Sequence, residues 1–371
     1  MPSLSETIAR LSAARGMGRA AASPTRLSEL TLSGSNPGAL KAYTYLPDLL
    51  APNAPLVVVL HGCTQSAADY DHGSGWSQLA DRHGFALLFP EQQRANNPHL
   101  CFNWFAPDDI HRNGGEVLSI VQMIRSLIDA HGLDERRVFV TGLSAGGAMA
   151  AVMLATHPDI FAGGAVIAGL PFGCAASVPE AMARMRGQGL PAEAALVDAV
   201  LAASPHTGPW PSLSIWHGMQ DHTVAPAAGE AVLSQWRGVH GLEVAATETQ
   251  ALGAHRHRIW RDGAGMARVE AFAIAGMGHG APIQAGDGIG AAGPYMLNAG
   301  ISSTRHIAAF WQIADAVAAT DTDHESADAE TGFAARPSPR DGFPHRLTPA
   351  RQASGPGKVI EDALRAAGLM R

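Results

Sequence analysis

The chain has 371 residues, 46% of them hydrophobic and only 16% charged, so it is long enough to bury a sizeable core in one large or two small domains. Its 26 Lys and Arg stand against 33 Asp and Glu, a net charge of −7, which argues against a nucleic-acid-binding surface and against attraction to anionic membranes. No run approaches the roughly 20 apolar residues of a membrane span. Residues 1–22 lack the apolar core of a signal peptide, so we expect a cytoplasmic location by default, with a trimmed leader or unconventional secretion left open.

The first elements predict an antiparallel hairpin and then the start of a parallel sheet. Leu27–Leu32 and Ala39–Leu46 are short strand-like runs separated by a turn rich in Gly, Ser, Asn and Pro. Leu56–Leu60 is a continuous apolar run, as expected of a strand buried on both faces. Phe85–Phe89 is a second run of this kind, and we expect Pro90 to stop it.

The middle of the chain alternates predicted helices and strands. Apolar residues between Val117 and Ile128 follow helical spacing, with a start signal formed by Asn113 and Glu116 and a stop signal at Gly132. Repeated strand–helix units imply a mostly parallel sheet with helices on both faces, an α/β fold. Further strands are expected at 137–141, 164–168, 212–216 and 269–275, and further helices at 145–157, 227–237 and 304–317.

Two segments interrupt this alternation. Residues 175–211 carry helical apolar spacing and predict a helical insertion, a lid-like segment over the carboxyl ends of the strands. Residues 319–356 are poor in large apolar side chains and predict a flexible linker, and residues 357–371 predict an amphipathic helix that either packs as a tail or binds a partner. With a helical or frayed segment at 1–25, residues 26–318 remain as the main α/β domain.

Ser144 stands in a Gly-Leu-Ser-Ala-Gly turn between a predicted strand and a predicted helix. This context distinguishes a nucleophile turn of the α/β-hydrolase type from a chance match in a glycine-rich chain. Side chains at Gly142 or Gly146 would collide with neighbouring backbone, and the helix that starts at Ala145 directs free N–H groups toward developing negative charge. The sequence therefore predicts Ser144 as a nucleophile. The alternative is a passive serine in a glycine-rich turn.

A serine nucleophile needs a base, and in this fold the acid and then the histidine follow it along the chain. Asp221 lies five residues beyond the predicted strand that ends at Trp216. His279 lies among glycines after the last predicted strand. The order predicts a catalytic triad of Ser144, Asp221 and His279 within the domain 26–318.

Several residues compete for these roles. His217 and His222 flank the predicted acid but precede the last strand. A metal site at His255 and His257 lacks a Cys or carboxylate at a fixed spacing, so we expect no metal and no organic cofactor. Asp262 and Asp287 are alternative acids in turns that we expect to be solvent-exposed.

The oxyanion hole is expected to use two backbone N–H groups, that of Ala145 and that of Cys63 in the loop after the first buried strand. Cys101 would emerge at the same edge of the sheet, so a Cys63–Cys101 disulfide would brace this loop against Trp104. The alternative is that all three cysteines, including Cys174, are buried thiols. We predict substrate contacts from Trp104 and Leu143, with simple core packing as the alternative for Trp104.

Six motifs along the chain occur together: Leu60-His-Gly-Cys-Thr-Gln-Ser66, Phe89-Pro-Glu-Gln92, Cys101-Phe-Asn-Trp-Phe105, Asn113-Gly-Gly-Glu116, Thr141-Gly-Leu-Ser-Ala-Gly-Gly-Ala-Met149 and Ala168-Gly-Leu-Pro171. With these motifs the chain resembles the polyhydroxybutyrate depolymerase family of esterases, whose relatives act on feruloyl and acetyl esters of plant polysaccharide. The resemblance covers roughly residues 40–315 and implies an α/β-hydrolase fold, the triad and the oxyanion hole given above, and an ester substrate.

The expected activity is two-step hydrolysis of poly- or oligo-(3-hydroxybutyrate) or similar short-chain esters. Feruloyl or acetylxylan ester hydrolysis is the alternative, and a peptidase of the same fold or a non-catalytic binding module is less favoured. The methionines of the predicted insertion are typical of an apolar, adaptable pocket wall. The sequence leaves the acyl group, the choice between polymer and oligomer, and the oligomeric state open.

Overall fold

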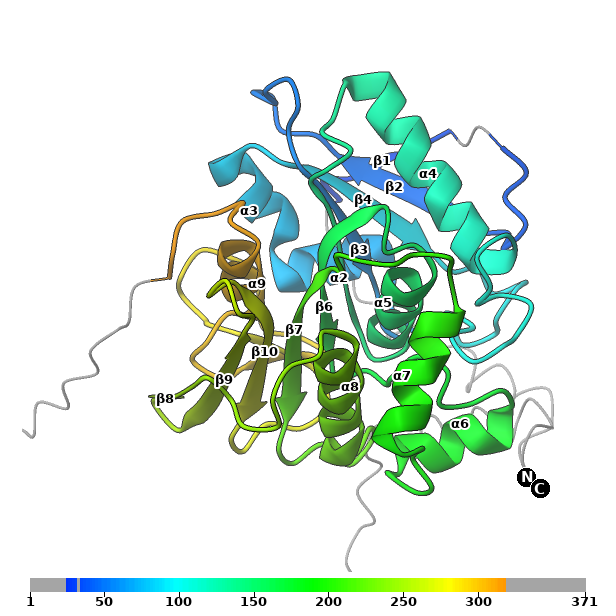
Figure 1. Cartoon of the computed structure of the whole chain (residues 1–371). Helices are drawn as coiled ribbons and strands as arrows, with labels where there is room; N and C mark the ends of the chain where they lie inside the picture. Colours follow the sequence, from blue (N-terminus) through cyan, green and yellow to red (C-terminus); the bar gives the residue numbers. More distant parts are fainter. Residues whose placement is uncertain (1–24, 32–33, 318–371) are drawn as a thin grey trace, which may run out of the picture. The chain divides into compact units, whose positions relative to one another are not determined.

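A computed structural model describes residues 25–31 and 34–317 (Figure 1). The predicted linker 319–356 and the predicted helix 357–371 lie outside the described residues, as does the segment 1–25 apart from its last residue. In the described part of the chain, ten strands form one sheet in the order β1-β2-β4-β3-β5-β6-β7-β10-β9-β8. No helix there is long and apolar enough to cross a membrane.

The strands in the middle of the sheet are parallel, and nearly all of their residues are buried, as predicted for strands covered on both faces. These strands are β4 (Ala86–Glu91), β3 (Leu56–Leu60), β5 (Val138–Leu143), β6 (Phe161–Ile167), β7 (Ser212–Gly218) and β10 (Ala267–Ile274). Antiparallel strands flank them: β1 (Ser28–Glu29) and β2 (Lys41–Tyr45) on one side, β9 (His255–Arg261) and β8 (Glu248–Leu252) on the other.

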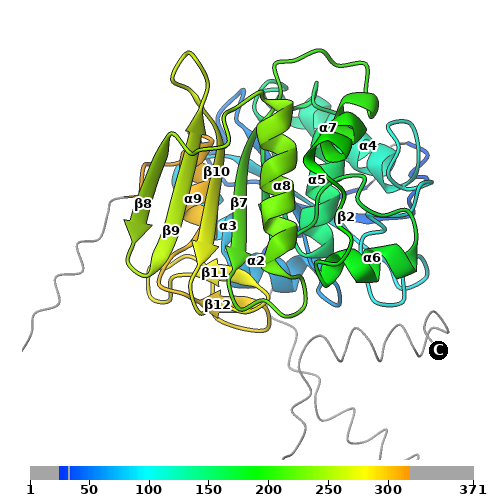
Figure 2. The same cartoon turned by 60° about the horizontal axis from the view of Figure 1, so that its bottom comes forward.

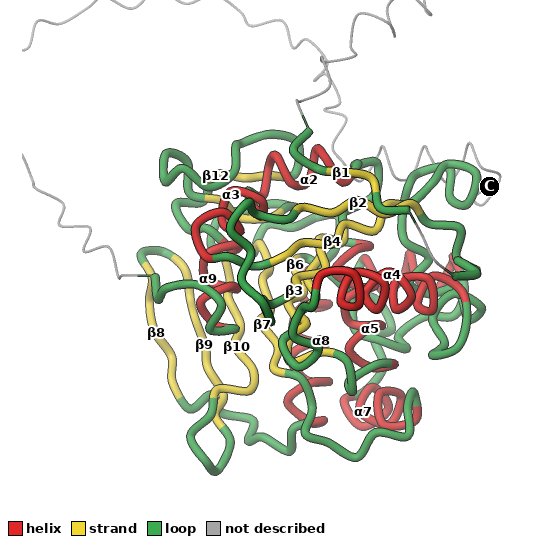
Figure 3. The backbone as a smooth tube through the Cα atoms, turned by 90° about the horizontal axis from the view of Figure 1, so that it is seen from above, coloured by secondary structure: helices red, strands yellow, loops and turns green. Residues whose placement is uncertain are grey.

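Helices cover both faces of the sheet, which confirms the predicted α/β architecture (Figures 1 and 3). Leu56, Val58 and Leu60 of β3 face one hydrophobic cluster, whereas Val57 and Val59 face the other, as the two-residue period of a strand requires. The first cluster includes α4 (Gly115–His131), α5 (Ala145–Thr156), α7 (Glu193–Ala202) and α8 (Pro226–Val239). The second includes α2 (Ala67–Ser74), α3 (Trp76–His83) and α9 (Ser303–Phe310).

Several predicted boundaries differ from those in the structure, among them the end of the second buried strand and the end of the last helix. Strand β4 continues through Pro90 to Glu91, because beyond Leu88 it pairs only with β2 and no longer with β3, so the missing proline N–H breaks no bond to β3. The predicted last helix, 304–317, ends at Phe310.

The insertion at 175–211 forms two helices, α6 (Val178–Met185) and α7. Leu196 and Val200 of α7 are fully buried, and the Gln235 side chain of α8 donates to the Leu196 carbonyl at 2.8 Å. This half of the insertion is therefore part of the helical layer over the sheet rather than a lid. Helix α6 ends beside the loop after β7, where the Ala225 N–H donates to the Met185 carbonyl at 2.7 Å.

Beyond β10 the chain forms a second, two-stranded parallel sheet that the sequence does not predict. Its strands are β11 (Ala281–Ile283) and β12 (Met296–Asn298), seen below the main sheet in Figure 2. A glycine-rich loop joins them, and β11 begins two residues after His279. This small sheet therefore fixes the chain immediately after the predicted catalytic histidine.

Candidate active site

Ser144 lies between β5 and α5 with φ 58° and ψ −117°, a backbone conformation that is unfavourable for a residue with a side chain. Its N–H donates to the Ile167 carbonyl at 2.9 Å, which ties the turn to the neighbouring strand β6. A Cβ atom at Gly142 would lie 2.4 Å from the Gly146 carbonyl oxygen, and one at Gly146 would lie 2.3 Å from the Leu60 carbonyl oxygen. The predicted need for glycine on both sides of the serine is confirmed.

The Ser144 side chain has no structural role in the turn or in the helix that follows it. It does not cap α5, and it makes no hydrogen bond with any residue that the structure describes, while the residue is 7% exposed. The N–H groups of the first turn of α5, beginning with Ala145, have no partner from this side chain and carry the positive end of the helix dipole. The turn therefore offers a hydroxyl group beside backbone donors, as a nucleophile and half of an oxyanion hole require.

Asp221 and His279 form a buried pair. The His279 Nδ1 atom lies 2.7 Å from Asp221 Oδ2, and Asp221 Oδ1 accepts the N–H groups of Thr223 at 2.8 Å and Val224 at 2.9 Å. Burial raises the pKa of the Asp221 carboxyl, but hydrogen bonds from His217, His279 and the Val224 N–H outweigh burial and hold the pKa well below its usual range.

Because the Asp221 carboxylate is ionised and can only accept, the hydrogen of this contact belongs to His279 Nδ1. In the neutral imidazole the lone pair is then on the Nε2 atom of His279, which is the tautomer that a general base needs. The structure brings Asp221 and His279 together as predicted from chain order, and it shows no hydrogen bond between His279 and Ser144. Such catalytic hydrogen bonds are often long in the free enzyme and shorten when substrate binds.

The competing acids are engaged elsewhere. Asp262 pairs with Arg268 at 2.7 Å, and Asp287 accepts the Ile289 N–H at 2.8 Å and lies 3.5 Å from Arg305. Neither carboxylate contacts His279, so the choice of Asp221 over its rivals agrees with the contacts.

The competing histidines also have other partners. His257 Nε2 lies 2.8 Å from the Glu270 carboxylate, His255 Nε2 lies 2.8 Å from the Ala299 carbonyl, and His222 is exposed. His217 contacts Asp221 itself, at 3.5 Å through Nε2. Within residues 25–31 and 34–317 no three His, Cys, Asp or Glu side chains are grouped as metal ligands.

The loop after β3 carries the predicted second oxyanion donor, Cys63. Cys63 and Cys101 form a disulfide, and the Thr64 N–H donates to the His99 carbonyl at 2.7 Å, so two connections tie this loop to the segment around Cys101. The neighbouring His61 is buried, which lowers its pKa to about 4. It accepts the Gln92 N–H at Nε2 (3.1 Å), so its Nδ1–H donates to the Gly62 carbonyl (2.8 Å).

Glu116 is a structural residue of the site that the sequence pattern did not reveal. The predicted cap formed by Glu116 and Asn113 is wrong: the N-cap of α4 is Gly114, and the fully buried Glu116 carboxyl group accepts the Gln92 side chain at 2.6 Å and the Asn103 N–H at 2.9 Å. Gln92 also donates to the Cys101 carbonyl at 3.0 Å. Burial raises the pKa of Glu116 to about 8. Through Gln92 and Asn103, the Glu116 side chain thus stabilises the loop that carries Cys101.

The two predicted substrate contacts are both buried side chains. Trp104 is 7% exposed and packs edge-on against Phe105, with ring centroids 5.2 Å apart. Leu143 is 1% exposed and belongs to the second hydrophobic cluster, on the face of the sheet opposite to that of Trp104. Core packing accounts for both positions, and contact with substrate stays a prediction for each.

The parallel sheet, the strained serine between strand and helix, and the acid and histidine on loops after later strands define an α/β-hydrolase. Residues 40–267 match the family model described as "Esterase PHB depolymerase". The chain therefore belongs to this esterase family, and the resemblance predicted from its motifs is confirmed.

Relatives from this group are similar over most of the chain. The chain is 43% identical over 291 residues to poly(3-hydroxyalkanoate) depolymerase C of Paucimonas lemoignei, covering 77% of this chain and 70% of that protein. It is 35% identical over 267 residues to feruloyl esterase B of Talaromyces stipitatus, covering 69% and 72%. The structure of an acetyl xylan esterase from Aspergillus awamori matches with a TM-score of 0.63 and 29% identity, covering 68% and 93%.

Proposed function

We propose that this carboxylic ester hydrolase is a serine esterase in which Ser144 is the nucleophile, His279 the general base and Asp221 the residue that orients the histidine. The observation that carries the proposal is the 2.7 Å contact between His279 Nδ1 and the buried Asp221 carboxylate, on loops that follow the serine turn in the expected order. This contact places the hydrogen of the neutral imidazole on Nδ1, so that its Nε2 atom carries the lone pair that accepts a proton.

The reaction proceeds in two steps. His279 Nε2 accepts the Ser144 hydroxyl proton as Oγ attacks the ester carbonyl carbon, and it then gives that proton to the oxygen of the departing alcohol. Water next attacks the acyl-serine with His279 again as the base, which releases the carboxylic acid and restores the hydroxyl. Asp221 stabilises the imidazolium that forms in each step, and it remains ionised throughout because its pKa is well below the usual range.

The negative charge of each tetrahedral intermediate is accepted by the backbone N–H groups of Ala145 and Cys63. A donor of this kind contributes about 3–4 kcal/mol of transition-state stabilisation in other acyl-transfer enzymes. The disulfide and the Glu116 contacts favour a fixed Cys63 loop, since a donor that needs no reorganisation during the reaction is the more effective one.

The proposed substrates are poly- or oligo-(3-hydroxybutyrate) and similar short-chain esters. The support is the 43% identity with a poly(3-hydroxyalkanoate) depolymerase. Feruloyl or acetylxylan ester hydrolysis is the second candidate, because a feruloyl esterase and an acetyl xylan esterase are also similar over about two thirds of this chain.

The test is hydrolysis of p-nitrophenyl butyrate by the full chain and by Ser144→Ala, His279→Ala and Asp221→Asn variants. We expect kcat to fall by roughly 10⁴-fold or more in the serine and histidine variants. His222→Ala, which removes an exposed histidine next to the acid, is the matched control and should keep the activity. Near-wild-type turnover in Ser144→Ala or His279→Ala would refute the triad. Comparison of 3-hydroxybutyrate oligomers with feruloyl and acetyl-xylan esters then decides between the two substrate classes.

A further inference from the structure

Tyr295 lies beside His279 because the paired strands β11 and β12 begin just after these two residues, with Ala281 opposite Met296. The ring centroids are 6.2 Å apart and the rings are nearly perpendicular, at 81°. Tyr295 is half-buried, and its hydroxyl makes no hydrogen bond with any of the residues described. An aromatic ring with a free phenol therefore stands next to the proposed general base.

The backbone of Tyr295 has φ +63°, in the left-handed region that bulky residues rarely adopt. The conformation is held by its own carbonyl, which accepts the Ala281 N–H at 2.8 Å. A Cβ atom at Gly280 would lie 2.6 Å from the same carbonyl oxygen, so only glycine permits this approach directly after His279. Unfavourable backbone conformations of this kind cluster at functional sites, where the surrounding structure maintains them.

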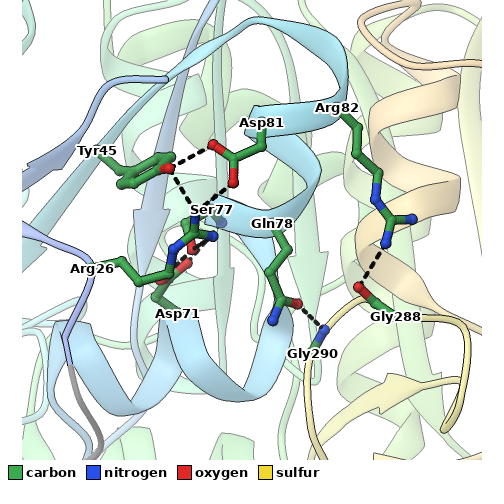
Figure 4. A network of polar contacts seen from close by, with 9 residues as sticks. All are labelled: Arg26, Tyr45, Asp71, Ser77, Gln78, Asp81, Arg82, Gly288 and Gly290. Carbon is green, nitrogen blue, oxygen red and sulfur yellow. Dashed lines mark hydrogen bonds and ion pairs between the residues drawn. The ribbon is translucent and has the colours of Figure 1, made fainter. Parts of the chain in front are cut away.

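The loop that leads to Tyr295 is anchored to α2 and α3, as Figure 4 shows for two of its glycines. The Gln78 side chain accepts the Gly290 N–H at 2.6 Å, and Arg82 donates to the Gly288 carbonyl at 2.8 Å. The Ala291 N–H donates to the Gly73 carbonyl at 3.0 Å.

Helix α3 is itself fixed to the first strands. Asp81 accepts the Tyr45 hydroxyl at 2.5 Å and pairs with Arg26, and Arg26 also donates to Ser77 at 3.1 Å (Figure 4). The loop that leads to Tyr295 is therefore held by contacts that extend through α3 to Arg26 and Tyr45, as the support of a preorganised binding residue requires.

We propose that Tyr295 is a specificity-determining residue that contacts the alcohol portion of the ester substrate. The proposal rests on the proposed function, because His279 must donate its proton to the oxygen of the departing alcohol and that alcohol must therefore lie against the imidazole. With its centroid 6.2 Å from that of the imidazole, the Tyr295 ring is close enough to border the space that the alcohol would occupy. Its free hydroxyl suits alcohols that carry a hydrogen-bond acceptor, such as the carboxyl or ester group of a hydroxyacid oligomer, over plain alkyl alcohols.

The experiment compares two esters with the same acyl group. In ethyl 3-hydroxybutyrate the alcohol is a plain ethyl group, whereas in the 3-hydroxybutyrate dimer it carries a carboxylate. We expect Tyr295→Phe to lower kcat/KM for the dimer by about three- to tenfold, the effect of one lost hydrogen bond, and to leave the ethyl ester unchanged. Tyr295→Gly suits the positive φ, so it should fold and should lower the dimer preference further because the ring is lost as well.

Tyr43→Phe is the matched control, since it removes the hydroxyl of another half-buried tyrosine on β2 and should leave the substrate ratio unchanged. The measured quantity is the ratio of kcat/KM for the dimer to kcat/KM for the ethyl ester. A ratio that is the same in the wild type and in both Tyr295 variants would overturn this inference. Absence of hydrolysis of both esters by the wild type, or full activity in Ser144→Ala, would instead overturn the proposed function and this inference with it.

Discussion

The Nε2 atom of His217 lies 2.8 Å from the Val224 carbonyl oxygen and 3.5 Å from the Asp221 carboxylate. His217 is the penultimate residue of β7, so its hydrogen bond to Val224 closes the loop that carries the acid and brings the two ends of that loop together. Its other nitrogen, Nδ1, is buried without a partner among the described residues, and the Nε2–H donates to the Val224 carbonyl. Asp221 thus contacts two imidazoles: that of His279, the proposed base, and that of His217, which holds the acid loop.

We expect His217→Leu to lower kcat/KM by roughly tenfold, the effect of losing one buried hydrogen bond in the acid loop. His217→Gln should retain more activity, because its amide N–H can reach the same carbonyl oxygen. Steady-state kinetics of both variants over a range of pH give the measurement. Equal losses in the two variants would show that the hydrogen bond to Val224 is not what matters.

The disulfide between Cys63 and Cys101 closes a loop with a sequence separation of 38. In the chain-entropy model, removing it with Cys63→Ser and Cys101→Ser lowers the free energy of unfolding by about 4 kcal/mol. We expect kcat to fall as well, since the Cys63 N–H would no longer be held against the Cys101 segment. Denaturant unfolding and ester hydrolysis check the two effects separately. An unchanged unfolding midpoint would contradict the first.

Cys174 provides the corresponding thiol test. It is buried, and burial raises the pKa of its thiol to about 12, so it should be unreactive in the folded protein. A thiol reagent should therefore label no cysteine of the described domain in the native state and one after unfolding without reductant. Labelling of three cysteines in the unfolded, unreduced protein is incompatible with the disulfide.

Gly146→Ala tests the close approach of α5 to β3. The new Cβ atom would lie 2.3 Å from the Leu60 carbonyl oxygen and 2.5 Å from that of His61, distances that force the backbone apart. We expect a loss of about 3 kcal/mol in unfolding free energy together with a large loss of activity, because the serine turn must move. Gly263→Ala is the control, since nothing lies within 4 Å of its Cβ position. Similar behaviour of the two variants would disprove the crowding.

Four histidines make the stability of the fold depend on pH. Burial is the main cause that lowers the pKa of His61, His157, His240 and His306 to about 4 each. Between pH 4 and 6.5 the unfolded chain binds more protons at these residues than the folded chain does, so stability rises with pH in this window and is lost as pH falls. For a fully buried residue such as His61 the contribution is on the order of 3 kcal/mol.

Thermal unfolding between pH 7 and pH 4.5 measures this effect. The His306 ring packs edge-on against Phe272 and at a tilt against Trp216, so His306→Phe should keep the packing and reduce the pH dependence. Glu116, whose pKa burial raises to about 8, contributes with the opposite sign between pH 4.5 and 8. Burial also raises the pKa of Asp71, Glu91 and Asp109. We expect the four imidazoles to outweigh these carboxyls below pH 6.5, because each imidazole pKa is lowered to about 4. A midpoint that is constant over this range would contradict the prediction.

Much of the fold could be predicted because its signals are local. The all-apolar run of β3 and the helical spacing of α4 each depend on a few consecutive residues. A prediction failed where a local spacing did not identify the partner of a side chain. Glu116 stands three residues after Asn113, the spacing of a helix cap, but its hydrogen-bond partners are Gln92 and Asn103. Strand β8 and the pair β11–β12 escaped prediction because short edge strands have little hydrophobic pattern.

The sequence by itself determined the serine turn, the order of acid and base, and the family, since these depend on residue identity and on the sequence of strands along the chain. Only the tertiary structure decided which carboxylate meets His279, because Asp221, Asp262 and Asp287 carry the same chemistry and differ only in where their loops emerge. It also placed Tyr295 beside His279. That contact depends on the positive φ of Tyr295 and on a glycine-rich loop that is hydrogen-bonded to α2 and α3. Neither feature produces a periodic pattern in the sequence.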